Sequence, residues 1–286
     1  MPVIPPIYRE SPSHVVHLTK PFRGEPPLKC LVNILKERKI SAFNNFGLAR
    51  EFASNFRRAH PDAKLRTQKT VCFTAVPLHW LPSVCRRRNS EFGLGFTKSW
   101  LTHKNGNHVI YAEKDKPLFN AFKALTDEAR RSPAARILNL LDSLELDPQN
   151  KVLVTRIISN APVDMSAMGM ETIWAITPFV DGPGEYQGRS YRFDWEMEWR
   201  VRGSLTFEDD DVELLVMPEK YHDQVRHLKV TGLPDPKLVK VKTPSTRTYK
   251  CPIIDPNWEF ERIEEEFESV RQELRLADEE DFFDDI

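Results

Sequence analysis

The sequence predicts an α+β protein, because strand-like segments lie on either side of a helical middle portion of the chain. Runs rich in β-branched and aromatic residues are typical of strands. They occur at residues 14–19, 70–76, 92–97, 108–112, 172–180, 196–202 and 212–216. Strands grouped separately from helices indicate a mixed or antiparallel sheet with flanking helices.

The first elements are a strand and a helix. Residues 14–19 contain two valines and stop before Pro21, which favours a short strand. Leu28, Leu31 and Leu35 then recur at three- and four-residue intervals, which predicts an amphipathic helix that ends before Ile40.

Glycine and proline bound the next elements. Pro77 ends the strand at 70–76, and Gly93 and Gly95 interrupt the strand at 92–97. Glycine inside a strand indicates a bulge, or close approach of a backbone or a ligand. Residues 99–104 form a short helix or a loop in this interpretation. The helical middle follows, with apolar residues at helical spacing: Leu118, Phe122, Leu125 and Ala129, then Ile137, Leu141 and Leu144.

The later segments include one strand whose residue types carry chemistry. Residues 172–180 are predicted to be a strand, and 181–190 form a loop rich in glycine and proline. Residues 196–202 alternate polar and apolar side chains, so Glu198 and Arg200 would share one strand face, where they could form an ion pair.

Length and composition indicate one large core. The chain has 286 residues, of which 40% are hydrophobic, enough for a globular domain over residues 13–250. Residues 1–12 are rich in proline and predict an extended lead-in. The sequence has no apolar run of membrane-spanning length and no signal-peptide pattern, so we expect a cytoplasmic protein without membrane contact. Four scattered cysteines and eight histidines suggest neither a disulfide framework nor a metal site.

Residues 251–276 are predicted to be a C-terminal amphipathic helix. Phe260, Ile263, Phe267, Val270 and Leu274 are spaced 3, 4, 3 and 4 and form one apolar seam. An acidic tail follows at 277–286. The seam either docks on the protein's own core or, with the acidic tail, binds a basic partner.

Charge is uneven along the chain. Residues 1–110 contain 18 Lys and Arg against 6 Asp and Glu, a net charge of +12. Residues 251–286 contain 3 against 14, a net charge of −11. A basic half favours nucleic acid or another acidic partner, although basic runs are also found on ordinary solvated faces. The candidate contacts are Arg57, Arg58, Arg86, Arg87 and Arg88.

The standard catalytic signatures, including a P-loop, a dinucleotide-binding glycine motif, a nucleophile elbow and a zinc-protease motif, are absent. Three separated pieces remain. They are His17 with Thr19; Phe73 and Thr74 together with Phe92, Gly93, Gly95 and Phe96; and Glu198 with Arg200.

The ordered set of these motifs resembles the AbiGi family of abortive phage-infection proteins. The matching strings are HLTK (17–20), LVNILKERKISA (31–42), VCFTAVPL (71–78), FGLGFTKSWL (92–101), GNHVIYAE (106–113), WEMEWRV (195–201) and VELLVMPEKY (212–221). The resemblance covers roughly residues 14 to 220. It implies a defence protein on the antitoxin side of a pair whose other member is a nucleotidyltransferase-like toxin.

The same motif order is similar to ADP-ribosyltransferases, which implies that fold and NAD as substrate. By this resemblance His17 and Thr19 would hold the NAD ribose and the nicotinamide edge. Phe92 or Phe96 would line the ring pocket, with Phe73, Thr74, Gly93 and Gly95 as further cofactor-binding positions. Glu198 would stabilise the positive charge that develops as nicotinamide leaves, since a carboxylate there favours the transition state. Arg200 would pair with Glu198 or clamp the pyrophosphate.

Two hypotheses stay open at this point. The first is an NAD-consuming ADP-ribosyltransferase or glycohydrolase in anti-phage defence. The second is a non-enzymatic module that binds a toxin or nucleic acid.

Overall fold

The computed structural model describes residues 13–50, 52–53, 67–75, 77–114, 116–128, 174–186, 189–191, 197–230 and 245–284. These residues form a mixed α+β arrangement, as predicted. The sequence predicted a single domain over 13–250, whereas the chain divides into two compact units. Unit 1 comprises Met1–Lys39, Ala75–Trp100 and Thr206–Ile286, and unit 2 comprises Ile40–Thr74 and Leu101–Leu205.

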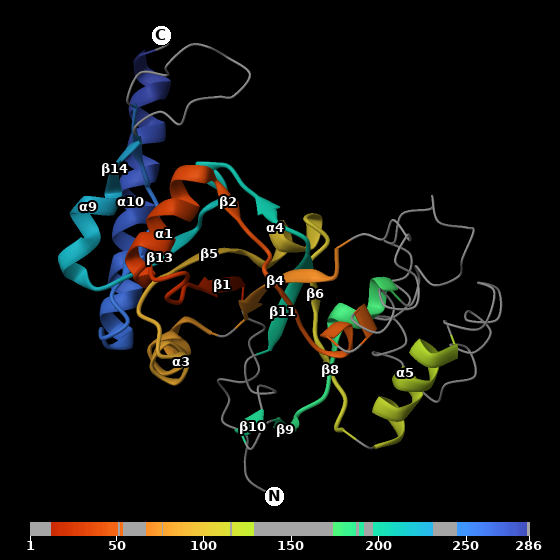
Figure 1. Cartoon of the computed structure of the whole chain (residues 1–286). Helices are drawn as coiled ribbons and strands as arrows, with labels where there is room; N and C mark the ends of the chain where they lie inside the picture. Colours follow the sequence, from red (N-terminus) through yellow and green to blue (C-terminus); the bar gives the residue numbers. More distant parts are fainter. Residues whose placement is uncertain are drawn as a thin grey trace, which may run out of the picture. The chain divides into compact units, whose positions relative to one another are not determined.

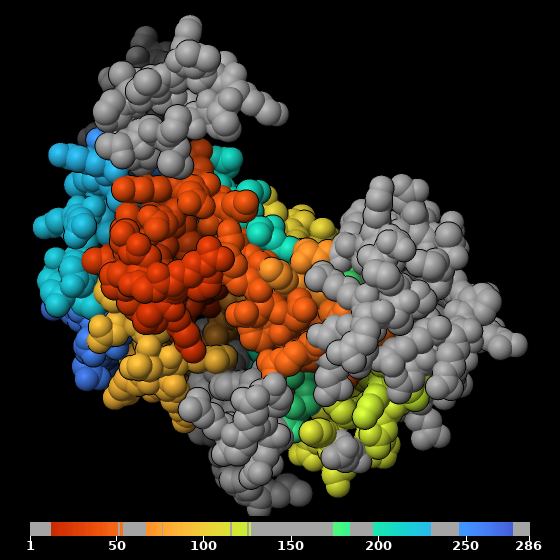
Figure 2. All heavy atoms as spheres, viewed as in Figure 1, coloured from red at the N-terminus to blue at the C-terminus, as the bar shows by residue number. Residues whose placement is uncertain are grey.

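The strands of unit 1 come from both ends of the chain. Their order is β16-β13-β5-β1, and only the β13–β16 pair is parallel. Their bounds are β1 His14–Leu18, β5 Gly93–Thr97, β13 Leu214–Val216 and β16 Ile253–Ile254. A separate antiparallel pair is β14 His227–Val230 with β15 Ser245–Thr248. Figure 2 shows the N-terminal segments, in red, bordered by C-terminal segments in blue.

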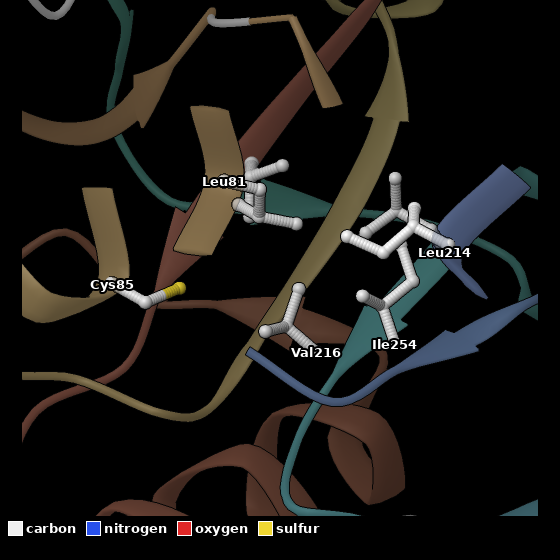
Figure 3. Close-up of a cluster of buried hydrophobic side chains, with 7 residues drawn as sticks. Leu81, Cys85, Leu214, Val216 and Ile254 are labelled. Atoms are coloured by element: carbon white, nitrogen blue, oxygen red, sulfur yellow. The ribbon is translucent and has the colours of Figure 1, made fainter. Parts of the chain in front are cut away.

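Four helices of unit 1 contain buried residues: α1 Pro27–Glu37, α3 Leu81–Arg88, α9 His222–Arg226 and α10 Phe260–Asp284. Three short 3-10 turns, η2 Leu78–Trp80, η5 Asp209–Asp211 and η6 Glu219–Tyr221, contain none. Figure 3 shows Leu81 and Cys85 facing Leu214, Val216 and Ile254 within a single buried cluster. That cluster also holds Ile263 of α10, so the C-terminal helix packs on the core of its own unit.

Unit 2 centres on β11, which pairs antiparallel with β4 on one side and β6 on the other. The bounds are β3 Asn44–Asn45, β4 Lys69–Thr74, β6 Asn107–His108 and β11 Glu198–Arg202. Around them lie β7 Ile110–Tyr111, β8 Val180–Asp181, β9 Gly184–Tyr186, β10 Arg189–Tyr191, α5 Pro117–Glu128 and η3 Thr177–Phe179 (Figure 1). Three elements span the chain boundaries between the units: β2 Lys39–Ile40, α4 Lys98–His103 and β12 Leu205–Thr206.

The prediction of a strand at residues 172–180 is wrong. Residues 174–176 are helical and continue into η3, and only Val180 begins a strand. Pro178 cannot donate to a ladder. Thr177 instead bonds to Gln68 Oε1 at 2.8 Å and to the carbonyl of Trp174 at 3.3 Å, which stabilises a turn.

Two further boundaries differ from the prediction. The segment 108–112 forms two short strands rather than one, because β6 pairs antiparallel with β11 while β7 pairs parallel with β8. The C-terminal helix starts at Phe260, not at 251, since β16 and a turn precede it, and it runs on to Asp284. The lead-in 1–12, the helix at 137–144 and the basic residues Arg57 and Arg58 lie outside the described residues.

Candidate functional site

The central polar feature of unit 2 is a buried cluster around Arg200, which we call the Arg200 cluster: Glu198, Arg200, Asp181, Tyr111 and Cys72. Arg200 is 0% exposed, Glu198 4% and Asp181 5%. Residues so polar are almost never buried without partners. The cluster must therefore satisfy its own charges and hydrogen bonds.

The strand register sets the core of this cluster. Successive side chains of a strand point to opposite faces, so Glu198 and Arg200 of β11 share one face, as the sequence indicated. Cys72 of β4 is the register partner of Arg200, and Thr74 is the partner of Glu198. Glu198 and Arg200 are 4% and 0% exposed, so this face of β11 is covered rather than open to water.

The Arg200 guanidinium donates four hydrogen bonds to Glu198, Asp181 and Pro178 of unit 2. Its Nε donates to Glu198 Oε1 at 2.8 Å and its Nη2 to Glu198 Oε2 at 3.1 Å. Nη2 also donates to Asp181 Oδ2 at 2.5 Å, and Nη1 to the carbonyl of Pro178 at 2.8 Å. The guanidinium is held by β11, β8 and η3 together.

Two neighbours close the space around the guanidinium. The Phe46 ring lies 5.1 Å from Arg200 Cζ, within cation–π range. Gly47 follows at φ +56, and a Cβ there would be 2.0 Å from the carbonyl oxygen of Val180 and 3.3 Å from Arg200 Nη1. Only glycine fits a chain that approaches this closely.

The electrostatics favour an ionised pair with neutral donors around it. Burial alone would raise the pKa of Glu198, but the charge and hydrogen bonds of Arg200 outweigh burial and hold that pKa below its usual value. Burial and the nearby Glu198 carboxylate raise the pKa of Tyr111 and of Cys72 well above the usual values. Tyr111 stays protonated and donates its hydroxyl to Glu198 Oε2 at 2.8 Å.

The cluster leaves little of Glu198 for a substrate. One carboxylate oxygen accepts from Arg200 Nε, and the other accepts from Arg200 Nη2 and Tyr111. A catalytic carboxylate must touch the reacting atoms, whereas this one is 4% exposed. The arrangement is well suited to fixing strands to each other, and poorly suited to proton transfer.

The predicted cofactor residues fall into different units. Phe73, Thr74, Glu198 and Arg200 belong to unit 2, whereas His17, Thr19, Phe92, Gly93, Gly95 and Phe96 belong to unit 1. Within unit 1, β1 and β5 bring one group together, with His17 opposite Leu94. The Thr19 hydroxyl points to two backbone carbonyls, those of Pro27 at 3.1 Å and Phe92 at 3.2 Å. The single hydroxyl proton of Thr19 is therefore used in hydrogen bonds to the protein's own backbone.

The aromatic and glycine positions of unit 1 have packing roles. Phe96 is 0% exposed and stacks on Trp100 with a centroid separation of 4.2 Å. A Cβ on Gly93 would lie 2.7 Å from the carbonyl oxygen of His17, and one on Gly95 would lie 2.7 Å from Leu214 Cγ. Both glycines let neighbouring strands approach closely.

One pocket of unit 1 is lined in part by residues that the sequence analysis predicted to bind a ligand or partner. It has a volume of about 400 Å³ and is lined by Pro27, Cys85, Arg86, Asn89, Ser90, Glu91, Phe92, Pro256 and Asn257. It contains Phe92, but none of the other predicted cofactor residues, and it contains Arg86, which was predicted to contact nucleic acid or a partner. Arg86, Arg87 and Arg88 form the last turn of α3, where positive charge also complements the helix dipole.

Sequence reasoning missed Tyr111, Asp181 and Cys72. Tyr111 stood in a predicted strand, and Asp181 opened a predicted loop, so neither had a sequence relation to Glu198. Cys72, which is partly buried, lies opposite Arg200 because β4 pairs with β11, and no local pattern in the sequence indicates that pairing. Within the described ranges, no group of three or more His, Cys, Asp or Glu side chains is arranged to hold a metal ion.

The comparisons with known proteins add no relative. No family model matches the chain, and neither the characterised proteins nor the solved structures searched contain a match. In the part of the chain that the structure describes, no helix has the length and apolar character needed to cross a bilayer.

Proposed function

We propose that this chain is a non-catalytic binding protein that acts in the cytosol on the protective side of an abortive-infection pair. The role comes from the resemblance to the AbiGi family, and the partner it implies is a nucleotidyltransferase-like toxin. The observation that carries the non-catalytic part is the closed Arg200 cluster, in which both oxygens of Glu198 are occupied.

Several features of unit 1 agree with binding rather than catalysis. Thr19 and Phe96 are engaged in loop and core contacts, which supports structural roles for them. The last helix, α10, carries many exposed carboxylates. The C-terminal segment that contains it, residues 251–286, has a net charge of −11. Complementary charge accelerates association and selects partners, and it needs no reaction centre.

The competing function is NAD cleavage by an ADP-ribosyltransferase-like site. In that function Glu198 must stabilise positive charge on the departing sugar. Glu198→Gln then abolishes nicotinamide release while the fold survives. In the binding function the purified chain releases no nicotinamide at all, and Glu198→Gln changes only stability.

The test combines two measurements on the full-length chain. The first follows nicotinamide release from labelled NAD, with wild type and Glu198→Gln, with and without extract from phage-infected cells. The second co-expresses the chain with a nucleotidyltransferase-like abortive-infection toxin and measures growth, with co-purification as the binding readout. We expect no nicotinamide release, together with co-purification and restored growth.

Two outcomes contradict the proposal. Nicotinamide release that is lost in a folded Glu198→Gln variant establishes the enzyme. Failure of the chain to bind the toxin or to restore growth removes the protective role. An RNA oligonucleotide added to the binding assay separates nucleic-acid binding through Arg86, Arg87 and Arg88 from protein binding, because RNA competes only for a surface that contacts phosphate groups.

A further inference from the structure

The pocket of unit 1 that contains Phe92, which we call the Phe92 pocket, has a buried floor and an exposed rim. The buried residues of its lining include Cys85, Ser90 and Phe92, which are 2%, 3% and 8% exposed. Pro256 is buried as well, and Pro27 is half-buried. The volume of about 400 Å³ lies at the lower end of the range for small-molecule sites, so the pocket has room for one small molecule and not for a polymer.

The rim of the Phe92 pocket carries two opposite charges. Its exposed lining residues are Arg86, Asn89, Glu91 and Asn257. Within the part of the chain that the structure describes, neither Arg86 nor Glu91 forms an ion pair. Arg86 Nη2 has one long hydrogen bond, to the Ser83 hydroxyl at 3.4 Å. A guanidinium and a carboxylate that line one pocket without an ion-pair partner are available to a ligand.

The floor beside Glu91 is uncharged. Burial, and then the charge of Glu91, raise the pKa of the Cys85 thiol to about 12, so the thiol is neutral at pH 7. The effect of Glu91 on this thiol also indicates that the carboxylate lies close to the floor. Cys85 belongs to the buried cluster of unit 1 that Figure 3 shows, so the floor is continuous with the apolar core.

Hydrogen bonds fix the lining before any ligand binds. Asn89 ends α3 with φ 49, a conformation that asparagine tolerates. The Ser90 hydroxyl donates to the carbonyl of Phe92 at 3.2 Å. In the C-terminal segment, Asp255 Oδ1 accepts from the backbone N–H of Asn257 at 2.8 Å and from its Nδ2 at 3.0 Å. A lining fixed in this way loses little conformational entropy when a ligand binds.

The two charges restrict the chemical class of the ligand. A simple anion would be attracted by Arg86 and repelled by Glu91, and a simple cation would meet the reverse. An uncharged apolar molecule would take water from both charged groups without replacing it. A small zwitterion satisfies both, because a guanidinium matches a carboxylate and a carboxylate accepts from an ammonium group.

We propose that the Phe92 pocket binds a free α-amino acid with an apolar side chain. Arg86 binds the carboxylate of the amino acid, and Glu91 binds its ammonium group. The apolar side chain packs on Phe92 and Cys85. This inference goes beyond the proposed function and does not depend on it, since it assigns a small-molecule ligand to a chain whose proposed partner is a protein.

The experiment is isothermal titration calorimetry of the full-length chain with L-leucine, L-methionine and L-phenylalanine. Two analogues of leucine each lack one charge: 3-methylbutylamine has no carboxylate, and 4-methylpentanoate has no ammonium group. We expect at least one of the amino acids to bind. Relative to leucine, each analogue should bind at least about tenfold more weakly, because it leaves one charged group of the pocket without a partner.

Two variants assign the charges to their residues. In Arg86→Met, leucine should bind at least about tenfold more weakly and no better than 3-methylbutylamine. In Glu91→Gln, leucine should lose a similar factor and bind no better than 4-methylpentanoate. The matched controls are Arg87→Met and Glu259→Gln, which change neighbouring residues outside the pocket lining and should stay within about twofold of wild type. Circular dichroism confirms that all four variants keep their fold.

Four outcomes overturn the amino-acid site. Absence of binding by all three amino acids contradicts it directly. Equal or tighter binding of either leucine analogue to the wild-type chain would make the pocket a site for a simple anion or a simple cation. Equal losses in the variants and their matched controls would show a general effect of surface charge. Tighter binding of NAD than of any amino acid, lost in Arg86→Met, would assign the pocket to NAD instead.

Discussion

Arg200 holds Glu198 in a two-pronged ion pair inside unit 2, with Nε to Oε1 at 2.8 Å and Nη2 to Oε2 at 3.1 Å. Both side chains are almost completely buried, at 0% and 5% exposure. A planar guanidinium matches a carboxylate in this geometry better than a lysine ammonium does. The pair and its neighbours connect β11 to β8 and η3.

The first prediction concerns the loss of this pair. Arg200→Met should lower the free energy of unfolding of unit 2 by about 3–5 kcal/mol, because removal of one partner leaves a buried carboxylate uncompensated. Urea denaturation measures the loss, and hydrogen exchange in β4 and β11 shows that it belongs to unit 2.

The matched control for Arg200 is Arg271→Met on α10. Arg271 pairs with Glu268 at 2.6 Å, but the two side chains are 60% and 62% exposed. Exposed pairs contribute less than about 1 kcal/mol, and Met and Arg have similar helix propensity. Equal losses in the two variants would show that the Arg200 cluster does not stabilise the fold.

The second prediction isolates the Tyr111 hydroxyl. It donates to Glu198 Oε2 at 2.8 Å, and hydrogen bonds to charged groups contribute about 1.5–3 kcal/mol. Tyr111→Phe should lower unfolding stability by that amount while keeping the ring. The control is Tyr221→Phe, whose ring packs on Phe92 with centroids 5.8 Å apart. If Tyr111→Phe lowers the free energy of unfolding no more than Tyr221→Phe does, then the hydrogen bond from Tyr111 to Glu198 does not stabilise the fold.

The sequence indicated the Glu198–Arg200 pair of the Arg200 cluster, but it did not indicate Asp181 or Tyr111. Strand alternation placed Glu198 and Arg200 on one face, so their pairing was an open alternative from the spacing alone. Asp181 and Tyr111 arrive from segments 17 or more residues away in the chain, through the parallel β7–β8 pair. Pairing between distant segments is set by tertiary packing, which local patterns do not encode.

The same distinction explains the errors in the fold. The run at 172–180 has strand-forming residues, yet Gln68 and Thr177 hydrogen bonds and Pro178 make it helical there. Elements with strong local periodicity were predicted correctly, such as α1 and the seam of α10 from Phe260. No local pattern indicates the division into two units, because each unit combines distant parts of the chain.

The third prediction compares two glycines with positive φ. Gly24 has φ +82 and Gly47 has φ +56, so alanine is strained at both. A Cβ at Gly24 meets nothing within 4 Å, whereas one at Gly47 would lie 2.0 Å from the carbonyl oxygen of Val180. Gly24→Ala should cost about 1 kcal/mol from backbone strain. Gly47→Ala should cost about 1–3 kcal/mol more, because backbone must move.

Urea denaturation of the two glycine variants gives the difference directly. The shared cost of positive φ cancels in the comparison, so the remainder reports the close approach of Gly47 to β8. Similar losses for the two variants would mean that the segment at Gly47 shifts away easily and does not enclose Arg200.

The fourth prediction is a pH dependence centred on His14. His14 of β1 contacts the ring of Phe267 on α10, with centroids 5.9 Å apart. Burial, and then the charge of Arg271, lower its pKa below the usual 6.5. The unfolded chain therefore takes up this proton more readily than the folded chain does. The stability contribution of neutral His14 is fully present above about pH 6.5, and it is lost as pH falls from there through the lowered folded pKa.

Unfolding measured between pH 7.5 and pH 5 tests this sign with two variants. His14→Gln cannot take up the proton, so its stability should fall less than that of wild type over the range. Arg271→Gln removes one of the two causes, so its profile should lie between the others. Parallel curves for wild type and His14→Gln would show that other groups cause the acid sensitivity. A wild-type stability that rises as pH falls would reverse the sign and mean that the folded chain prefers charged His14. The expected order instead ties the contact between β1 and α10 to a neutral imidazole, because a second positive charge beside Arg271 in a half-buried site opposes that contact.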